Sequence, residues 1–164
     1  MMVREYLEQN VYEALRKRLK FIFEEFDNIY VSFSGGKDST YMLLEMIRRG
    51  MQIDAVVYAD TTMEFPAMYE HIDQVERFLM AERGISVTRL FPERPFEELM
   101  FEAIKTDSRY DFPGYGWPNS AVRWCTGEFK VRLIDAFSRT LPAKPYHYIG
   151  FAVDEPHRLK RKRN

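Results

Sequence analysis

One short segment combines glycines, hydroxyls and a lysine in a way that can hold an anion: Ser34, Gly35, Gly36, Lys37, Asp38 and Ser39. The adjacent glycines let the backbone turn so that successive N–H groups converge, and the lysine adds a full positive charge. An apolar run at 29–33 precedes the segment and a helical pattern follows it. This order favours phosphate, because a helix N-terminus offers unpaired amides and the positive end of the helix dipole.

The spacing excludes the two commonest phosphate-binding motifs. A Walker loop needs a glycine five residues before its Gly-Lys pair and a hydroxyl residue after the lysine, whereas Asp38 follows Lys37 here. The dinucleotide fingerprint has only a partial match at 114–116, which lacks the third glycine and does not lie between a strand and a helix. The pattern S-G-G-x-D-S instead resembles the PP-loop of the adenine nucleotide α-hydrolases, which cleave between the α and β phosphates or use nucleotides of that kind.

Hydrophobic periodicity predicts the elements that position this segment. An amphipathic stripe predicts an N-terminal helix over 2–26, and apolar runs predict strands in alternation with further helices. The strands are expected at 29–33, 54–59, 85–91 and 147–152, and the helices at 38–49, 66–83, from 96 onward, and from a Thr126 N-cap to 141. Between the last two helices, residues 106–124 predict a long loop of the kind that forms lids or binding sites.

Strands that alternate with helices indicate right-handed crossovers between parallel strands. We therefore predict an α/β fold: a single doubly wound, mostly parallel sheet with helices on both faces. Ligands bind such sheets beyond the carboxyl ends of the strands. By this rule we expect four stretches to converge: 34–39, 60–64, 123–125 and 150–158.

Taken together, the motifs of these stretches resemble the phosphoadenylyl-sulfate (PAPS) reductase family in order and spacing. The motifs are Phe33 to Ser39, Tyr58 to Pro66, Arg123 to Thr126 with Lys130, and Gly150 to Glu155. The resemblance covers about residues 29–158 and is nearest to short, reductase-like proteins of phages and mobile elements; the chain is also similar to the small subunit of ATP sulfurylase. It implies an HUP-type fold and a single domain over 1–164, with an N-terminal helix at 2–26, a core at 29–158 and a basic tail at 157–164.

The resemblance also implies roles for individual residues. The loop would hold the phosphate or sulfate end of an adenine nucleotide, ATP or PAPS, and Asp38 or Asp60 would help to hold Mg²⁺. The nucleotide-binding set is Ser34, Gly35, Gly36, Lys37, Asp38, Ser39, Asp60, Thr61, Lys130, Gly150 and Arg158, and the catalytic set is Lys37, Asp38, Asp60, Arg123 and Cys125. Within these sets, Arg123 and Lys130 would place positive charge over the leaving group, and Gly150 would let the backbone approach the base.

Three activities remain open. The first is an enzyme that acts at the α-phosphate of ATP, or on a sulfonucleotide, and releases pyrophosphate or sulfite. The second is a sulfur transferase that uses Cys125 with an external thiol or sulfur donor protein, and the third is a nucleotide-binding partner subunit without turnover. Two departures weigh against PAPS reduction itself: no cysteine follows Cys125, and Ala152 stands where those reductases usually have arginine.

Composition bounds the class of protein. A chain of 164 residues with 46% hydrophobic and 30% charged residues is typical of one soluble globular domain. The net charge of −1 argues against a general nucleic-acid binder, although basic residues gather in the tail at 157–163. A single cysteine excludes an internal disulfide and cannot alone hold an iron–sulfur cluster. With no signal peptide or membrane-spanning run apparent, we expect a cytoplasmic protein, and a homo-oligomer is left open.

Overall fold

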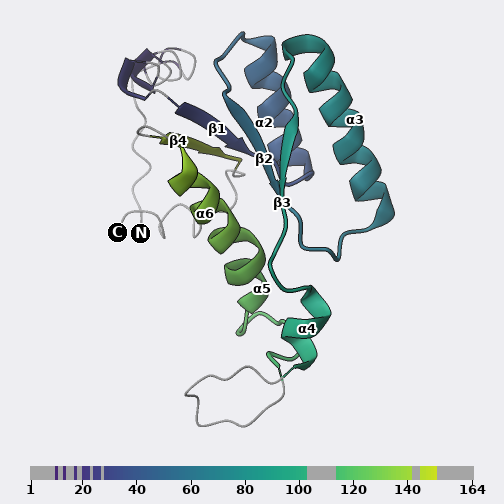
Figure 1. Ribbon diagram of the computed structural model, residues 1–164. Coiled ribbons are helices and arrows are strands. Elements are labelled where there is room, and N and C mark those ends of the chain that lie inside the picture. Colours follow the sequence, from purple (N-terminus) through teal and green to yellow (C-terminus); the bar gives the residue numbers. More distant parts are fainter. Residues whose placement is uncertain are drawn as a thin grey trace.

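The computed structural model describes residues 28–102, 114–141 and 145–150, together with scattered positions between 10 and 26. In this part of the chain four parallel strands form one sheet, in the order β3-β2-β1-β4 (Figure 1). The strands are β1 (Asn28–Ser32), β2 (Ala55–Ala59), β3 (Val87–Leu90) and β4 (Pro145–Ile149). The predicted parallel α/β sheet is therefore confirmed.

The register of the sheet brings the carboxyl ends of its strands to one edge. Val31 lies opposite Val56 of β2 and opposite Tyr148 of β4, while Val56 also lies opposite Val87 of β3. All three pairings are parallel, so the segments that follow β1, β2 and β4 leave the sheet on the same side. The predicted convergence of these segments follows from this topology.

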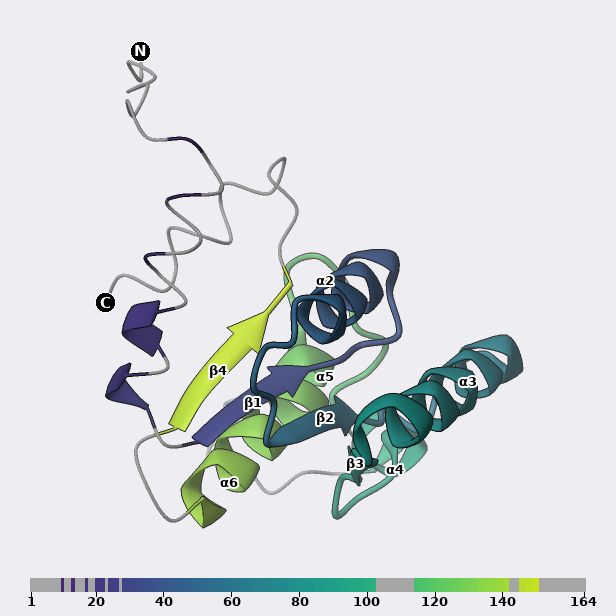
Figure 2. The same cartoon turned by 90° about the horizontal axis from the view of Figure 1, so that it is seen from above.

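Helices cover both faces of the sheet, as predicted. The longer helices are α2 (Lys37–Arg48) and α3 (Pro66–Arg83) on one face and α6 (Arg132–Thr140) on the other (Figure 2). Three short elements complete the described part: α4 (Phe96–Phe101), α5 (Trp124–Thr126) and η1, a π-helical turn over Gly127–Val131 that joins α5 to α6. Figure 1 shows α4 and α5 together below the sheet.

Local sequence sets the bounds of α3. Pro66 occupies its first position, where a missing N–H costs nothing, and Gly84 ends it in the left-handed conformation at φ 66°. A side chain of α3 also binds the end of α2. Arg83 Nη2 donates a 2.8 Å hydrogen bond to the main-chain oxygen of Ile47, near the last residue of α2. The two helices of this face are thus joined at one end.

Two groups of apolar side chains form the interior. The main cluster lies between the sheet and helices α2 and α3, and it includes Val31, Phe33, Leu43, Val56, Tyr58, Ile72, Val75 and Leu79. The aromatic cluster lies among α4, α5 and η1 and consists of Phe96, Leu99, Trp124 and Phe129. Its rings are in direct contact, with centroids 4.9 Å apart for Phe96 and Trp124 and 5.7 Å apart for Phe96 and Phe129.

The predicted N-cap at Thr126 is wrong. The helical segment begins three residues earlier, with Arg123 as N-cap of α5, and Thr126 is the last residue of that turn. Packing explains the difference: Trp124 is buried, its ring stacks on Tyr115, and its Nε1 donates a 3.0 Å hydrogen bond to the oxygen of Gly116. Burial of the indole outweighs the preference of threonine for a cap.

Several predicted bounds are shifted or fall only partly on described residues. The strands predicted at 54–59 and 85–91 are shorter, at Ala55–Ala59 and Val87–Leu90. Positions 13, 17, 20–22, 24 and 25 are helical, as predicted, and the other positions of 2–26 that would complete this helix lie outside the described residues. In the predicted loop, residues 114–123 contain no helix or strand, and 106–113 lie outside the described part. Within the described ranges, no helix has both the length and the apolar character needed to cross a bilayer.

Candidate functional site

The chain turns sharply between β1 and α2. After Ser32 it passes through Gly35, which has a left-handed backbone at φ 73°, and α2 begins at Lys37. A Cβ atom on Gly35 would lie 2.4 Å from the Sδ atom of Met68 in α3. Both the conformation and the space therefore require glycine here, which gives the predicted turn a physical basis.

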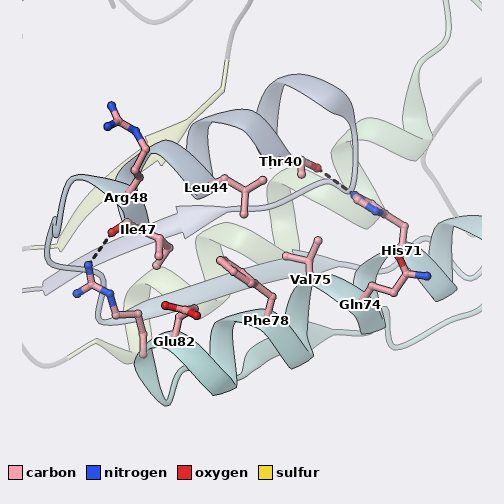
Figure 3. Close-up of a pocket in the computed structure, with 10 residues that line it drawn as sticks. Thr40, Leu44, Ile47, Arg48, His71, Gln74, Val75, Phe78 and Glu82 are labelled. Atoms are coloured by element: carbon pink, nitrogen blue, oxygen red, sulfur yellow. Dashed lines mark hydrogen bonds between the residues drawn. The ribbon is translucent and has the colours of Figure 1, made fainter.

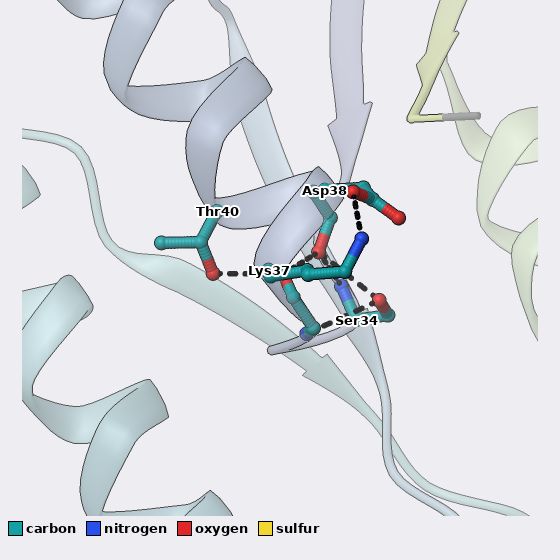
Figure 4. Close-up of polar contacts among 6 residues, drawn as sticks. Ser34, Lys37, Asp38 and Thr40 are labelled. Carbon is teal, nitrogen blue, oxygen red and sulfur yellow. Dashed lines mark hydrogen bonds and ion pairs between the residues drawn. The ribbon is translucent and has the colours of Figure 1, made fainter. Parts of the chain in front are cut away.

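Hydroxyl groups inside the loop hold its shape (Figure 4). Ser39 Oγ donates a 3.0 Å hydrogen bond to the oxygen of Gly36 and accepts one of 3.2 Å from the amide of Ser34. The hydroxyls of Ser34 and Ser39 lie 3.0 Å apart, and the amide of Gly36 donates to Ser34 Oγ at 3.4 Å. These contacts bring the first and last residues of the predicted motif together.

The end of α2 nearest the loop is open to an anion. Its N-cap is Gly36, so no side chain caps the first turn. Lys37 lies beside it with its side chain 86% exposed, and its Nζ atom forms a 2.7 Å ion pair with Asp38 Oδ1. The helix dipole and the lysine together place positive charge at the carboxyl end of β1.

The segment after β2 holds a buried carboxylate. Asp60 is 3% exposed, and its Oδ1 accepts hydrogen bonds from the amide of Thr62 at 2.7 Å and from the hydroxyl of Tyr69 at 2.9 Å. Thr62 has φ 63°, a left-handed backbone that threonine rarely adopts. Asp60 therefore shapes this turn, and a nucleotide contact from it stays a prediction.

Two carboxylates, Asp60 and Glu64, lie near the turn that follows β2. Thr61 Oγ1 donates to Glu64 Oε1 at 3.0 Å. The pKa of Tyr58 is well above its ordinary value, first because the ring is buried and then because Asp60 and Glu64 are near. Among the described residues, the buried hydroxyl of Tyr58 has no hydrogen-bond partner. The carboxylates of Asp60 and Glu64 thus make the surroundings of the Tyr58 hydroxyl negative.

A small cavity joins three segments that are far apart in the sequence. It measures about 60 Å³ and is lined by the ends of β1 and β2 and by the η1–α6 helix, including Ser34, Glu64 and Lys130. The predicted site residue Lys130 therefore shares a cavity with the loop. The volume is far below the several hundred Å³ of a pocket that encloses a drug-sized ligand, so this cavity fits part of a ligand rather than a whole nucleotide.

The end of β4 also reaches the loop. A Cβ atom on Gly150 would lie 3.3 Å from the main-chain oxygen of Asp38 and 3.3 Å from the Cα atom of Ser39. Gly150 is therefore in close contact with the first turn of α2, and its predicted approach to a base is untested. Arg158, with the rest of 151–164, lies outside the described residues.

The two remaining candidates lie at the start of the α5–η1–α6 helix. Arg123 is exposed at the N-cap of α5. Cys125 is half-buried and packs against the aromatic cluster. Lys130 follows on η1, where it reaches the cavity with Ser34. Of these three residues, the structure brings Lys130 to the loop.

Two residues of the site were not among the predicted ones. Glu64 lines the cavity with Ser34, although the sequence treats it only as part of a motif. His71, on α3, lies with its Nε2 atom 3.1 Å from Thr40 Oγ1. Its position directly before the buried Ile72 was the available signal, because that position borders the apolar stripe of α3.

Two sequence comparisons match this chain to known proteins. Residues 28–125 match the family described as the phosphoadenosine phosphosulfate reductase domain. An uncharacterized protein of Methanocaldococcus jannaschii is 31% identical to this chain over 130 residues. That alignment covers 79% of this chain and 21% of the relative, so the chain spans about a fifth of the relative's length. The family match includes the loop, Asp60 and Cys125, while Lys130 and Gly150 lie beyond it.

Proposed function

Because this chain belongs to the phosphoadenosine phosphosulfate reductase domain family, we propose that it binds an adenine nucleotide by its phosphate or sulfate end. The observation that carries the proposal is the turn of β1 into α2: a left-handed Gly35, a helix without a side-chain cap, and Lys37 beside it. Phosphate at such a helix end gains both hydrogen bonds and a favourable dipole. The nucleotide would be ATP or PAPS, as the family suggests.

The proposed reaction is attack by water or another nucleophilic acceptor at the α-phosphorus of ATP with release of pyrophosphate. The alternative is reductive cleavage of a sulfonucleotide by an external dithiol, which releases sulfite and leaves the dithiol oxidised to its disulfide. Catalysis would be electrostatic. Main-chain amides at the start of α2, together with Lys37 and Lys130, would stabilise the charge that develops on the leaving group. Two observations support these roles. Hydrogen bonds among its own hydroxyls hold the loop, and Lys130 lines the same cavity as Ser34.

A magnesium ion fits this arrangement if the nucleotide itself supplies most ligands. Among the described residues no group of three or more His, Cys, Asp or Glu side chains gathers as a metal site. Mg²⁺ usually keeps several waters and takes one or two carboxylates together with phosphates, so such a group is not required. Asp38 has a half-exposed carboxylate in the first turn of α2 and would hold the ion, whereas Asp60 Oδ1 already accepts two hydrogen bonds. When bound, the ion would neutralise phosphate charge.

Calorimetry with ATP, ADP, AMP and PAPS, each with Mg²⁺, followed by product analysis, tests the proposal. Consumption of ATP should yield pyrophosphate and an AMP-containing product. Consumption of PAPS, with dithiothreitol supplied as the reductant, should yield sulfite and oxidised dithiothreitol. Formation of ADP and phosphate would contradict the proposed bond cleavage. If a nucleotide binds and no product accumulates beyond the amount of protein, the chain is a nucleotide-binding subunit without turnover.

A second candidate function is sulfur transfer through Cys125. The observation in its favour is the position of this half-buried thiol in the first turn of α5, two residues after Arg123. A helix N-terminus and a cation both favour a thiolate. A sulfur donor protein or a small persulfide would load the thiol. Persulfide on Cys125 after incubation with such a donor, detected by mass spectrometry and absent in Cys125→Ser, would support this candidate; its absence in the wild-type protein would exclude it.

A further inference from the structure

Three hydrogen bonds meet at one main-chain carbonyl of the phosphate loop. The oxygen of Gly36 accepts from Ser39 Oγ at 3.0 Å, from Thr40 Oγ1 at 2.9 Å and from the amide of Thr40 at 3.0 Å. Together they direct this carbonyl into the first turn of α2. Because a trans peptide is planar with its C=O and N–H on opposite sides, the N–H of the same peptide, that of Lys37, is directed away from the helix.

The direction of the Thr40 hydroxyl proton decides which atom donates in the contact between Thr40 and His71. A threonine hydroxyl has one proton, and that of Thr40 is donated to the oxygen of Gly36. Thr40 Oγ1 must therefore accept at its second contact, the 3.1 Å approach of His71 Nε2. It follows that His71 carries a proton on Nε2. Figure 3 shows this contact, with His71 reaching from α3 toward Thr40 on α2.

His71 belongs to the same helix that supports the loop from below. One turn earlier on α3, Met68 fills the space beside Gly35, and the His71 ring lies 6.2 Å from the ring of Phe33 at the end of β1. The imidazole is half-buried at this junction. Helix α3 thus contacts the loop at two points, one apolar and one hydrogen-bonded.

We propose that His71 is a positioning residue for the phosphate loop. By donating to Thr40 it holds the hydroxyl that fixes the carbonyl of Gly36, and so it keeps the Lys37 amide turned toward the side where an anion would bind. The identity of that anion rests on the proposed function. The ordering of the loop by His71 rests on the hydrogen bonds alone. His71 itself need not touch the nucleotide.

Two measurements on the ligand-free protein test it. Nitrogen NMR should find the His71 proton on Nε2, and a neutral ring with its proton on Nδ1 would overturn the proposal. In His71→Leu, amide exchange of the Thr40 N–H should accelerate by about threefold to tenfold, the effect of losing one hydrogen bond, while amides of β2 keep their rates. Unchanged exchange at Thr40, or equal acceleration throughout α2 and β2, would also overturn it.

Two matched variants separate positioning from general destabilisation. His71→Gln keeps a side-chain N–H donor and should restore slow exchange at Thr40. Gln74→Leu, an exposed polar side chain one turn later on α3 in the same inter-helix groove of Figure 3, should leave the loop unaffected. If Gln74→Leu accelerates exchange at Thr40 as much as His71→Leu does, the proposal fails.

Binding of ATP with Mg²⁺ then links this role to the site. His71→Leu should weaken ATP binding by a factor similar to its effect on Thr40 exchange, and His71→Gln and Gln74→Leu should not. A wild-type protein that does not bind ATP or PAPS would refute the proposed function, while the proton position and the exchange rates would still decide whether His71 orders the loop.

Discussion

The main cluster and the aromatic cluster support different halves of the candidate site. Strands β1 and β2 and helices α2 and α3 contribute mostly aliphatic side chains to the main cluster, which includes Phe33, the residue directly before the loop at 34–39. The aromatic cluster consists of a few large side chains from α4, α5 and η1, and Cys125 packs against it. One half of the site therefore rests on many small contacts and the other on a few ring contacts.

This difference bears on how each half responds to change. In the main cluster, each side chain makes small contacts with many neighbours, so loss of one methyl group weakens each contact only slightly. The loop is also held by its own hydrogen bonds. In the aromatic cluster, Phe129 contacts both Phe96 and Trp124, so removal of this one ring takes a contact from each of the other two. We expect the position of Lys130, next to Phe129 on η1, to be the more sensitive of the two.

The strongest test of this contrast is Phe129→Ala. Phe129 is fully buried, and truncation of a buried phenylalanine costs about 3 to 5 kcal/mol of unfolding free energy. Chemical denaturation measures this cost. The matched control is Val131→Ala in the same turn, which is 52% exposed and should change stability by about 0.5 kcal/mol at most. Equal costs for the two variants would show that the aromatic cluster does not support this segment.

The next effect isolates the contact below the loop. Gly35→Ala places a left-handed residue against Met68, and we expect a loss of about 2 to 3 kcal/mol of unfolding free energy from strain and crowding together. Gly84→Ala has almost the same backbone, at φ 66°, with nothing within 4 Å of the added Cβ, so it should cost only about 1 kcal/mol. In a Met68→Ala background, which removes the crowding, Gly35→Ala should cost only about 1 kcal/mol, as Gly84→Ala does in the wild type. Equal losses would mean that Met68 moves aside without cost.

Loss of the loop's charge should affect binding rather than stability. Lys37→Ala should weaken nucleotide binding by about 1.5 to 3 kcal/mol, the scale of one charge-assisted hydrogen bond. Calorimetry of binding and a denaturant titration measure the two quantities. Lys20→Ala removes a similarly exposed lysine from the N-terminal region and should change neither. If Lys37→Ala binds nucleotide as tightly as wild type, the assignment of the loop as the phosphate site is wrong.

A smaller effect is expected at the edge of the aromatic cluster. Cys125 is half-buried, so Cys125→Ser should lower the unfolding free energy by about 1 kcal/mol, the low end of the range for burying a hydroxyl without a partner. Nucleotide affinity should stay the same. Iodoacetamide labelling of Cys125 measures its access, and protection of the thiol by ATP would place it beside the nucleotide. A labelling rate independent of nucleotide would favour a purely structural thiol.

The smallest effect lies on the solvent face of α2, outside both clusters. Hydrogen bonds from Arg48 and then Arg49 lower the pKa of Glu45 from its ordinary 4.5 to about 2. A carboxyl with a lowered pKa in the folded state stabilises the protein above pH 4.5, and this contribution is lost as the pH falls toward about 2. In Glu45→Gln the corresponding part of the acid-induced loss should disappear, and high salt should reduce it in the wild type. An identical acid profile in both proteins would show that the ion pairs do not form in solution.

The sequence predicts best where a residue constrains its own backbone. Pro66 and Gly84 mark the two ends of α3 as the structure has them, and Gly35 marks the turn before α2. These constraints act within one or two residues, so they are visible without knowledge of the fold. The alternation of apolar runs likewise suffices for the parallel sheet.

Prediction fails where distant residues decide. The start of α5 depends on Trp124 meeting Phe96 and Tyr115, which a local capping preference does not register. The role of His71 depends on a contact with Thr40, 31 positions away on another helix. The hydrophobic periodicity of one helix does not predict how that helix is placed against another. Roles toward a nucleotide stay predictions for all the candidate site residues, Asp60, Thr61, Arg123 and Gly150 among them.

The position of β4 in the sheet has a consequence for synthesis of the chain. β4 pairs with β1 although the hydrogen bond between Ser32 and His147 spans 115 residues, whereas β1, β2 and β3 follow one another with only α2 and α3 between them. At about 5 to 20 residues per second, the ribosome delivers β4 on the order of seconds after β3. During that interval the free edge of β1, with Ile29 and Val31, is exposed as a template for strand pairing with other chains. We expect a nascent chain that stalls before β4 to aggregate through this edge.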